Sequence, residues 1–88
     1  MPDGGPPQAS DGGFVWFTFG GPTALVRAHQ LLRAGGQRCA ITAAPAGHSP
    51  CGLALAVPRD ASEAALLVLR GLRATPQAVV DLQPERHD

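Results

Sequence analysis

The fold of this chain is decided by residues 14–23, which read FVWFTFGGPT. The first six of these residues are aromatic or β-branched, which is typical of a buried strand. Gly20 and Gly21 end the run, and Pro22 suits the first turn of a helix because its missing N–H is not needed there. The stretch therefore predicts a strand that leads directly into a helix.

Hydrophobic periodicity on either side of this stretch predicts the remaining elements. The helix that begins at Pro22 is expected to bury one apolar face and to stop at Gly35–Gly36 in a left-handed conformation. A second helix is expected to begin at Asp60, which resembles a capping box with Glu63, and to run to about Ala74. The other expected elements are strands at 38–44, 51–57 and 78–82, with a loop at 45–50.

The resulting order, β-α-β-β-α-β, predicts an α+β fold of the ferredoxin-like kind. In this two-layer sandwich a four-stranded antiparallel sheet carries both helices on one face. Alternation along the first strand places Phe14 and Trp16 on the opposite, open face. Because the neighbours on that face are small and mostly uncharged, we favour a homodimer contact through Phe14 and Trp16, or cover by the N-terminal tail, over RNA binding.

Length and composition limit the function classes. The 88 residues include seven Arg, no Lys and seven Asp and Glu, and this zero net charge disfavours binding to nucleic acid through phosphates. No apolar run approaches the roughly 20 residues of a membrane span, and the Gly- and Pro-rich start lacks a signal-peptide pattern. We therefore expect one cytoplasmic domain at 14–83, a disordered tail at 1–13 and a frayed C-terminus at 84–88.

The predicted topology brings one cysteine to the start of the first helix. The third strand should run antiparallel to the first, so that Cys51, at the start of the third strand, lies near Gly20, Gly21 and Thr23. Free N–H groups at a helix N-terminus stabilise a thiolate and lower its pKa below the free value of about 8.5. Two glycines would allow the backbone to approach the sulfur closely.

The loop around Cys51 offers further polar groups. It reads His48-Ser49-Pro50-Cys51-Gly52. If protonated or hydrogen-bonded to the sulfur, His48 would favour the thiolate. We interpret the string as a reactive-thiol loop in which His48 and Gly52 support Cys51. The alternative is that Cys51 packs as a small apolar residue.

The other cysteine and histidines are expected to be structural or solvated. Cys39 shares the expected core face with Ile41 and should pack there. A Cys39–Cys51 disulfide is disfavoured, because the expected hairpin separates the two residues by about 16 Å and a bridge needs about 7 Å. His29 is expected half-exposed on the first helix, and His87 in the tail. Without Cys-x-x-Cys or paired-His spacing, the sequence predicts no metal site and no cofactor.

Two segments of the chain match the pattern of a known family. They are Phe19-Gly20-Gly21-Pro22-Thr23 and Pro45-Ala46-Gly47-His48-Ser49-Pro50-Cys51-Gly52-Leu53-Ala54-Leu55. With them, residues 14–57 resemble the DUF3343 family of Se/S carrier-like proteins. That family shows an aromatic first strand, a Phe-x-Ser-Thr-His-like turn into a helix and a Pro-Arg-x-x-Ser-Ser-x-Cys-Gly-x-Ala-Leu-like stretch. The chain departs from this pattern at Thr23, where the family often has His, and at Ala46, where Arg is common.

The resemblance implies a carrier and not an enzyme. Cys51 would accept a sulfane sulfur or selenium atom from a donor enzyme and pass it to an acceptor protein, which requires an exposed thiolate and no cofactor. The alternative is a non-catalytic protein-interaction or small-ligand-binding domain in which Cys51 is structural. A thiol oxidoreductase is a weaker third hypothesis, since the chain has no Cys-x-x-Cys.

Overall fold

The computed structural model describes residues 13–45 and 47–81. The expectations for the tail before Gly13, for Ala46, for His87 and for the C-terminus at 84–88 lie outside these residues. The predicted order of elements is confirmed. The elements are β1 (Phe14–Thr18), α1 (Pro22–Ala34), β2 (Ala40–Ala43), β3 (Leu53–Pro58), α2 (Arg59–Gly71) and β4 (Ala78–Val80).

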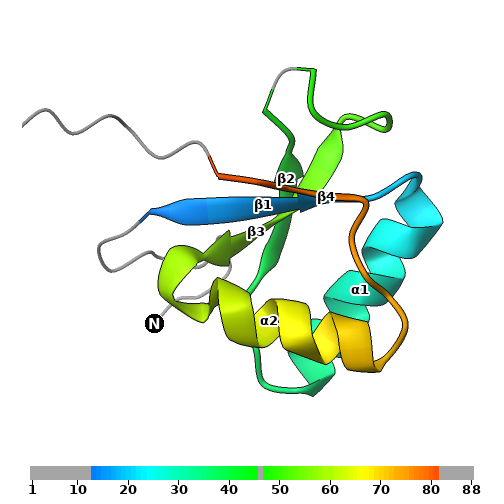
Figure 1. Cartoon of the computed structure of the whole chain (residues 1–88). Helices are drawn as coiled ribbons and strands as arrows, with labels where there is room; N and C mark the ends of the chain where they lie inside the picture. The colour runs from blue at the N-terminus through cyan, green and yellow to red at the C-terminus, as the bar shows by residue number, and fades with distance from the viewer. Residues whose placement is uncertain (1–12, 46, 82–88) are drawn as a thin grey trace, which may run out of the picture.

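The four strands form one antiparallel sheet in the order β2-β3-β1-β4. In its register Leu55 of β3 lies between Ile41 of β2 and Phe17 of β1, and Phe17 also lies opposite Val79 of β4. Both helices cover the same face of this sheet, which leaves the other face without a helix from the described residues (Figure 1). The prediction of a small α+β domain with an antiparallel sheet and two helices is thus confirmed.

The core lies between the helices and the face of the sheet that they cover. Alternation along β1 turns Val15 and Phe17 towards the helices, and Phe17 is completely buried. Each helix contributes one apolar face, as its spacing of three and four residues predicts. Cys39 belongs to the core, so its predicted packing role is confirmed. The cluster comprises Val15, Phe17, Phe19, Leu25, Ala28, Leu32, Cys39, Leu55, Val57, Ala65 and Leu69.

Helix α1 ends as the sequence predicts. The N–H of Gln37 donates to the carbonyl of Leu32 at 2.9 Å, and the N–H of Gly36 donates to that of Arg33 at 3.0 Å. This pair of bonds defines a Schellman motif, in which the residue after the cap is left-handed. Gly36 has a φ of 82°, so the left-handed stop is confirmed at this glycine.

Helix α2 ends in the same motif, but without a glycine at the left-handed position. The N–H of Ala74 donates to Leu69 at 2.8 Å, and that of Arg73 donates to Arg70 at 3.2 Å. Arg73 has a φ of 59°, a conformation that costs a residue with a Cβ roughly 1–2 kcal/mol. The helix ends at Gly71 and not at about Ala74, because the residues that follow form the terminating turn.

The start of α2 differs from the prediction. The helix begins at Arg59, directly after the last residue of β3, and no side chain caps it. The predicted capping box of Asp60 and Glu63 is therefore wrong. The chain passes from strand to helix without a loop, so the cap position falls on Pro58, whose side chain has no acceptor. The Ser62 hydroxyl donates instead to the Arg59 carbonyl at 2.9 Å.

All four strands are shorter than predicted, although β3 ends one residue later than predicted, at Pro58. β2 begins at Ala40, after Cys39, because only four of its residues pair with β3. β3 begins at Leu53 and not at Cys51, which belongs to the preceding turn. The last strand stops at Val80.

Arg59, the first residue of α2, contacts the residues at the start of β1 and just after the end of β4. Its backbone N–H donates to the Gly13 carbonyl at 3.0 Å, and its guanidinium donates to the Phe14 carbonyl at 3.5 Å. The same guanidinium forms an ion pair with Asp81, in which Nε donates to Oδ2 at 3.4 Å. Because Arg59 directly follows β3 and contacts the start of β1 and the residue after β4, this one residue links three neighbouring strands.

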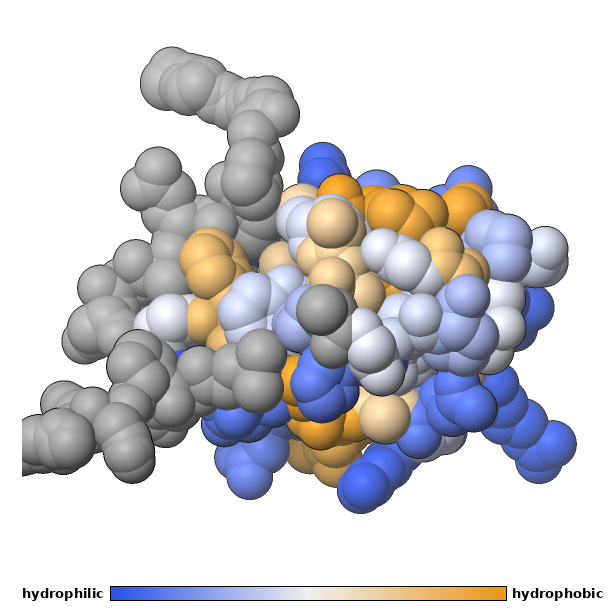
Figure 2. Space-filling view, turned by 90° about the horizontal axis from the view of Figure 1, so that it is seen from above, coloured by the Kyte–Doolittle hydropathy of each residue, from blue (hydrophilic) through white to orange (hydrophobic). Residues whose placement is uncertain are grey.

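Several residues of the sheet face without a helix are buried. Phe14 and Trp16 are half-buried, and in the register Trp16 lies between Ala56 and Val80. On the side of the molecule shown in Figure 2, the visible apolar areas lie between hydrophilic side chains. The homodimer contact through Phe14 and Trp16 stays a prediction. The buried residues of this face are Thr18, Ala54, Ala56, Pro58 and Val80.

Candidate functional site

The candidate site is the β2–β3 loop, in which residues 49–52 form a tight turn. The Gly52 N–H donates to the Ser49 carbonyl at 3.2 Å. Ser, Pro and Gly at the first, second and fourth positions are favoured in a type I turn, and Cys51 occupies the third. The Ala44 N–H then donates to the Gly52 carbonyl at 2.9 Å and closes the loop. The φ of Gly52 is 77°, a left-handed conformation that glycine adopts easily because it has no Cβ.

Cys51 carries the thiol of this site. It is partly exposed and packs at the margin of the core cluster. Its Sγ lies 3.6 Å from the Ser49 Oγ and 3.8 Å from the Leu53 carbonyl oxygen. The Ser49 hydroxyl itself donates to the Leu53 carbonyl at 2.8 Å. The three polar atoms therefore form one small hydrogen-bonding group around the sulfur.

The Ser49 hydroxyl has a single proton to donate. While Cys51 is a thiol, that proton goes to the Leu53 carbonyl, and the S–H group can donate to the Ser49 oxygen or to the same carbonyl. Once Cys51 ionises, its sulfur can only accept, and the hydroxyl stabilises the negative charge by turning towards it. Ser49 thereby links the protonation of Cys51 to the hydrogen bonding of the turn.

The surroundings shift the pKa values of the two thiols of the chain in opposite directions. The hydrogen bond with the Ser49 side chain is the main cause that lowers the pKa of Cys51. Burial raises the pKa of Cys39, against a smaller opposing effect of the Arg33 charge. At a given pH, a larger fraction of Cys51 than of Cys39 is therefore in the nucleophilic thiolate form.

Two of the predicted supporting residues lie in this loop. Gly52 shapes the turn, as described above. His48 is exposed, and its backbone N–H donates to the Pro45 carbonyl at 3.1 Å. Among the residues at 47–81, no hydrogen bond joins the His48 imidazole to the Cys51 sulfur. Support of the thiolate by His48 stays a prediction.

The other predicted supporting residues, Gly20, Gly21 and Thr23, lie at the start of α1. The register of β1 with β3 puts this turn and the Cys51 loop at the same end of the sheet (Figure 1). Within the described part of the chain, the hydrogen bonds of the sulfur run to Ser49 and Leu53 and none comes from α1.

The two glycines before α1 are not required by a close approach. A Cβ added at Gly20 or Gly21 would meet no atom within 4 Å, so the sulfur does not press against either residue. Gly21 is the N-cap residue with an extended φ of −163°, which any residue can adopt. The expected reason for two glycines here is therefore not found in the geometry.

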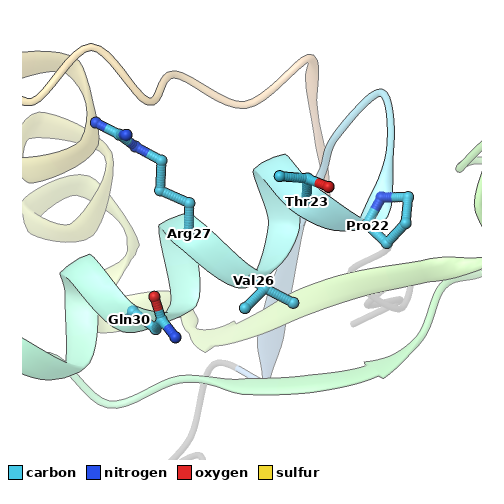
Figure 3. A pocket seen from close by; sticks show the side chains of 5 residues that line it. All are labelled: Pro22, Thr23, Val26, Arg27 and Gln30. Carbon is cyan, nitrogen blue, oxygen red and sulfur yellow. The ribbon is translucent and has the colours of Figure 1, made fainter.

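The first turns of α1 border a shallow depression that is separate from the thiol. Thr23 and Arg27 project to one side of the helix, and Val26 and Gln30 project to the other (Figure 3). Cys51 is not among the lining residues. The first turn contains no acidic residue and no side-chain cap, so its partial positive charge is not compensated by the helix itself. The lining residues are Pro22, Thr23, Val26, Arg27 and Gln30.

The described residues contain no group of three or more His, Cys, Asp or Glu side chains that could hold a metal ion. Cys39 and Cys51 are both free thiols. His29 is half-buried on α1, where burial and then the Arg33 charge lower its pKa. Neither helix of the described chain has the length and hydropathy needed to cross a membrane.

Ser49 is the site residue that the sequence prediction omitted. Two signals could have identified it. Ser-Pro-x-Gly is a favoured turn sequence, and in the Ser-Ser-x-Cys-Gly pattern of DUF3343 Ser49 falls on the second Ser. Comparisons of the chain with family models, curated proteins and solved structures give no match. The resemblance to DUF3343 therefore stays a prediction from the sequence.

Proposed function

We propose that this chain is a sulfur or selenium carrier in which the Cys51 thiolate holds the transferred atom. The observation that carries the proposal is the partly exposed Cys51 thiol with the Ser49 hydroxyl 3.6 Å from its sulfur. The resemblance of residues 45–55 to the Se/S carrier-like stretch supports it. Read from the other edge, the strand order β4-β1-β3-β2 supports placing the domain among ferredoxin-like sandwiches.

Loading proceeds by thiol–disulfide exchange. The Cys51 thiolate attacks the terminal sulfur of a persulfide on the donor enzyme, an S–S bond forms on Cys51, and the donor S–S bond breaks. The electron pair of the broken bond leaves with the donor cysteine as its thiolate. The sulfane sulfur therefore changes protein without any external oxidant or reductant. A selenium atom moves in the same way when it stands in place of the terminal sulfur.

Delivery repeats the exchange with the roles reversed. A thiolate of the acceptor protein attacks the atom held by Cys51, and Cys51 leaves as a thiolate. A thiol of lower pKa leaves faster, so the Ser49 hydroxyl assists this step as well as the attack. The uncompensated positive end of α1, with Gly20, Gly21 and Thr23, lies at the same end of the sheet and favours the approach of negative charge.

A non-catalytic binding domain is the second candidate. The observation that favours it is the packing of Cys51 at the margin of the core cluster, which a merely structural cysteine would also show. Under this alternative, a Cys51→Ser variant keeps its partner binding and stability. Under the carrier proposal, the same variant folds but transfers nothing.

The deciding experiment is the intact mass of the full chain after incubation with a cysteine desulfurase and cysteine, or with a selenocysteine lyase and selenocysteine. We expect the chain to gain the mass of sulfur or selenium, and peptide mapping to place it on Cys51. The Cys51→Ser variant should gain nothing, and the matched Cys39→Ala variant should be loaded like the wild type. A label on Cys39, or no label from either donor, would overturn the proposal.

A further inference from the structure

We propose that the free edge of β2 docks a second copy of the chain, whose own β2 pairs with it in antiparallel orientation and joins the two sheets. β2 is an edge strand, since it has β3 on one side and no strand of the described residues on the other. An unpaired strand edge presents N–H and C=O groups that bind another strand. This inference does not depend on the carrier function.

The hydrogen bond that closes the hairpin shows which groups face outward. Ala44 donates to Gly52 at 2.9 Å, so Ala44 belongs to a hydrogen-bonded pair of the β2–β3 ladder. Such pairs alternate along antiparallel strands, and therefore Thr42 and Ala40 also bond to β3. The backbone N–H and C=O groups of Ile41 and Ala43 consequently point away from the sheet.

This outward pattern is self-complementary. When two copies pair about a two-fold axis at Thr42, Ile41 of each copy lies opposite Ala43 of the other, and every outward donor meets an outward acceptor. The branched Ile41 then faces a small side chain, and the two Thr42 residues form a favourable cross-strand pair. The Ala43 carbonyl also accepts from the Thr42 hydroxyl at 3.2 Å, which leaves its second lone pair for the partner.

Charge does not oppose the pairing of two copies at this edge. β2 contains no ionisable residue, and the chain has zero net charge. The nearest charged residue, Arg38, lies four positions from Thr42, so the two-fold pairing carries the two Arg38 side chains to opposite ends of the joined strands. Edges that stay unpaired are often protected by a very short strand, charge, Pro or a bulge; β2 has four residues, one more than β4, and it has no charge, Pro or bulge.

The exposure of apolar side chains also supports β2 as the docking edge. Ile41 is 37% exposed although it stands opposite the fully buried Leu55, and its diagonal neighbour Leu53 is 39% exposed. A second β2 would cover apolar surface that the monomer leaves in water. The opposite edge is less suitable, because β4 has three residues and the same alternation leaves only Val79 with outward groups.

The test is the molar mass of the full chain in sedimentation equilibrium over a wide range of concentration. Ala43→Pro removes one outward N–H and keeps every bond to β3, and we expect it to raise the dimer dissociation constant by about tenfold or more. Val79→Pro makes the matched change on the other edge and should leave the dimer intact. Ile41→Lys provides a second variant of the β2 edge, since a charge there opposes strand pairing.

The register is tested by crosslinking. In a Cys51→Ser background, Thr42→Cys should form an oxidised covalent dimer through residue 42, because residues facing each other across the axis lie within disulfide range. Ala40→Cys, away from the axis, should not. A wild-type chain that stays monomeric up to about 1 mM, or a dimer that survives both β2 variants, overturns the inference. So does a dimer lost only on Trp16→Ala, which would place the contact on the sheet face.

Discussion

Cys39 and Cys51 lie at opposite ends of the β2–β3 ladder. The pKa of Cys39 is raised above the ordinary thiol value, and the pKa of Cys51 is lowered below it. Cys39 directly precedes Ala40 and is buried in the core, whereas Cys51 sits in the turn before Leu53. Each is a free thiol. One thiol therefore serves packing, and the other is available for chemistry.

The first prediction concerns their reactivity. Iodoacetamide should modify Cys51 faster than Cys39 near neutral pH, by more than about tenfold, because Cys51 is accessible and more of it is thiolate. The time course is followed by peptide mass spectrometry of the native chain. In denaturant the two rates should converge, which provides the control. Equal or reversed rates in the folded chain would count against the assignment of Cys51 as the working thiol.

The second prediction concerns Ser49. Its hydrogen bond stabilises the Cys51 thiolate, so Ser49→Ala should raise the pH at which alkylation of Cys51 reaches half its maximal rate. At a fixed neutral pH the variant should then react more slowly. Ser49→Thr keeps a hydroxyl and should restore most of the wild-type profile. A pH profile of Ser49→Ala that coincides with that of the wild type would show that the hydroxyl does not act on the sulfur.

The third prediction concerns the end of α2. Arg73 has a φ of 59°, which glycine adopts without strain, so Arg73→Gly should stabilise the domain by about 0.5–1 kcal/mol. For a domain of this size, each kcal/mol moves the melting temperature by roughly 4–8 °C. Arg73→Ala removes the same side chain but keeps the strain, and should give no such gain. Gly36→Ala, at the equivalent position of α1, should lower the melting temperature.

The fourth prediction concerns His29. Burial and the Arg33 charge lower its pKa below the ordinary 6.5, so the unfolded chain takes up this proton first as the pH falls. Stability should therefore decrease as the pH is lowered through about 6.5 to the folded pKa, and stay level above that range. His29→Gln should lose this part of the dependence of melting temperature on pH. Parallel curves for the variant and the wild type would contradict the assignment.

Much of the architecture could be predicted from local patterns. Alternation in β1 and the position of Gly36 each depend on residues close in the sequence, and both predictions are confirmed. The start of α2 could not be predicted in this way. Asp60 and Glu63 have the spacing of a capping box, but the strand runs into the helix without a loop, and this tertiary arrangement moves the cap to Pro58.

The geometry of the candidate site was predicted only in part. The loop and Cys51 were predicted from the sequence. Ser49 was not, because it reaches the sulfur through a turn that brings the Ser49 and Cys51 side chains to the Leu53 carbonyl. The sequence prediction named the neighbouring His48 instead. Ile41 illustrates the same limit for the surface. Its place in the alternating pattern puts it on the core face, but its strand lies at the edge of the sheet, where no further strand of the described residues covers it.

The contacts of Arg59 have a practical consequence for labelling. Gly13 and Asp81 both meet this residue, at the end of β3 that lies farthest from the Cys51 turn. A fluorophore or purification handle joined just before Gly13 or just after Asp81 would therefore leave the domain on the side remote from the thiol. Surface immobilisation through either attachment point should present Cys51 to an incoming protein, and the two orientations should behave alike.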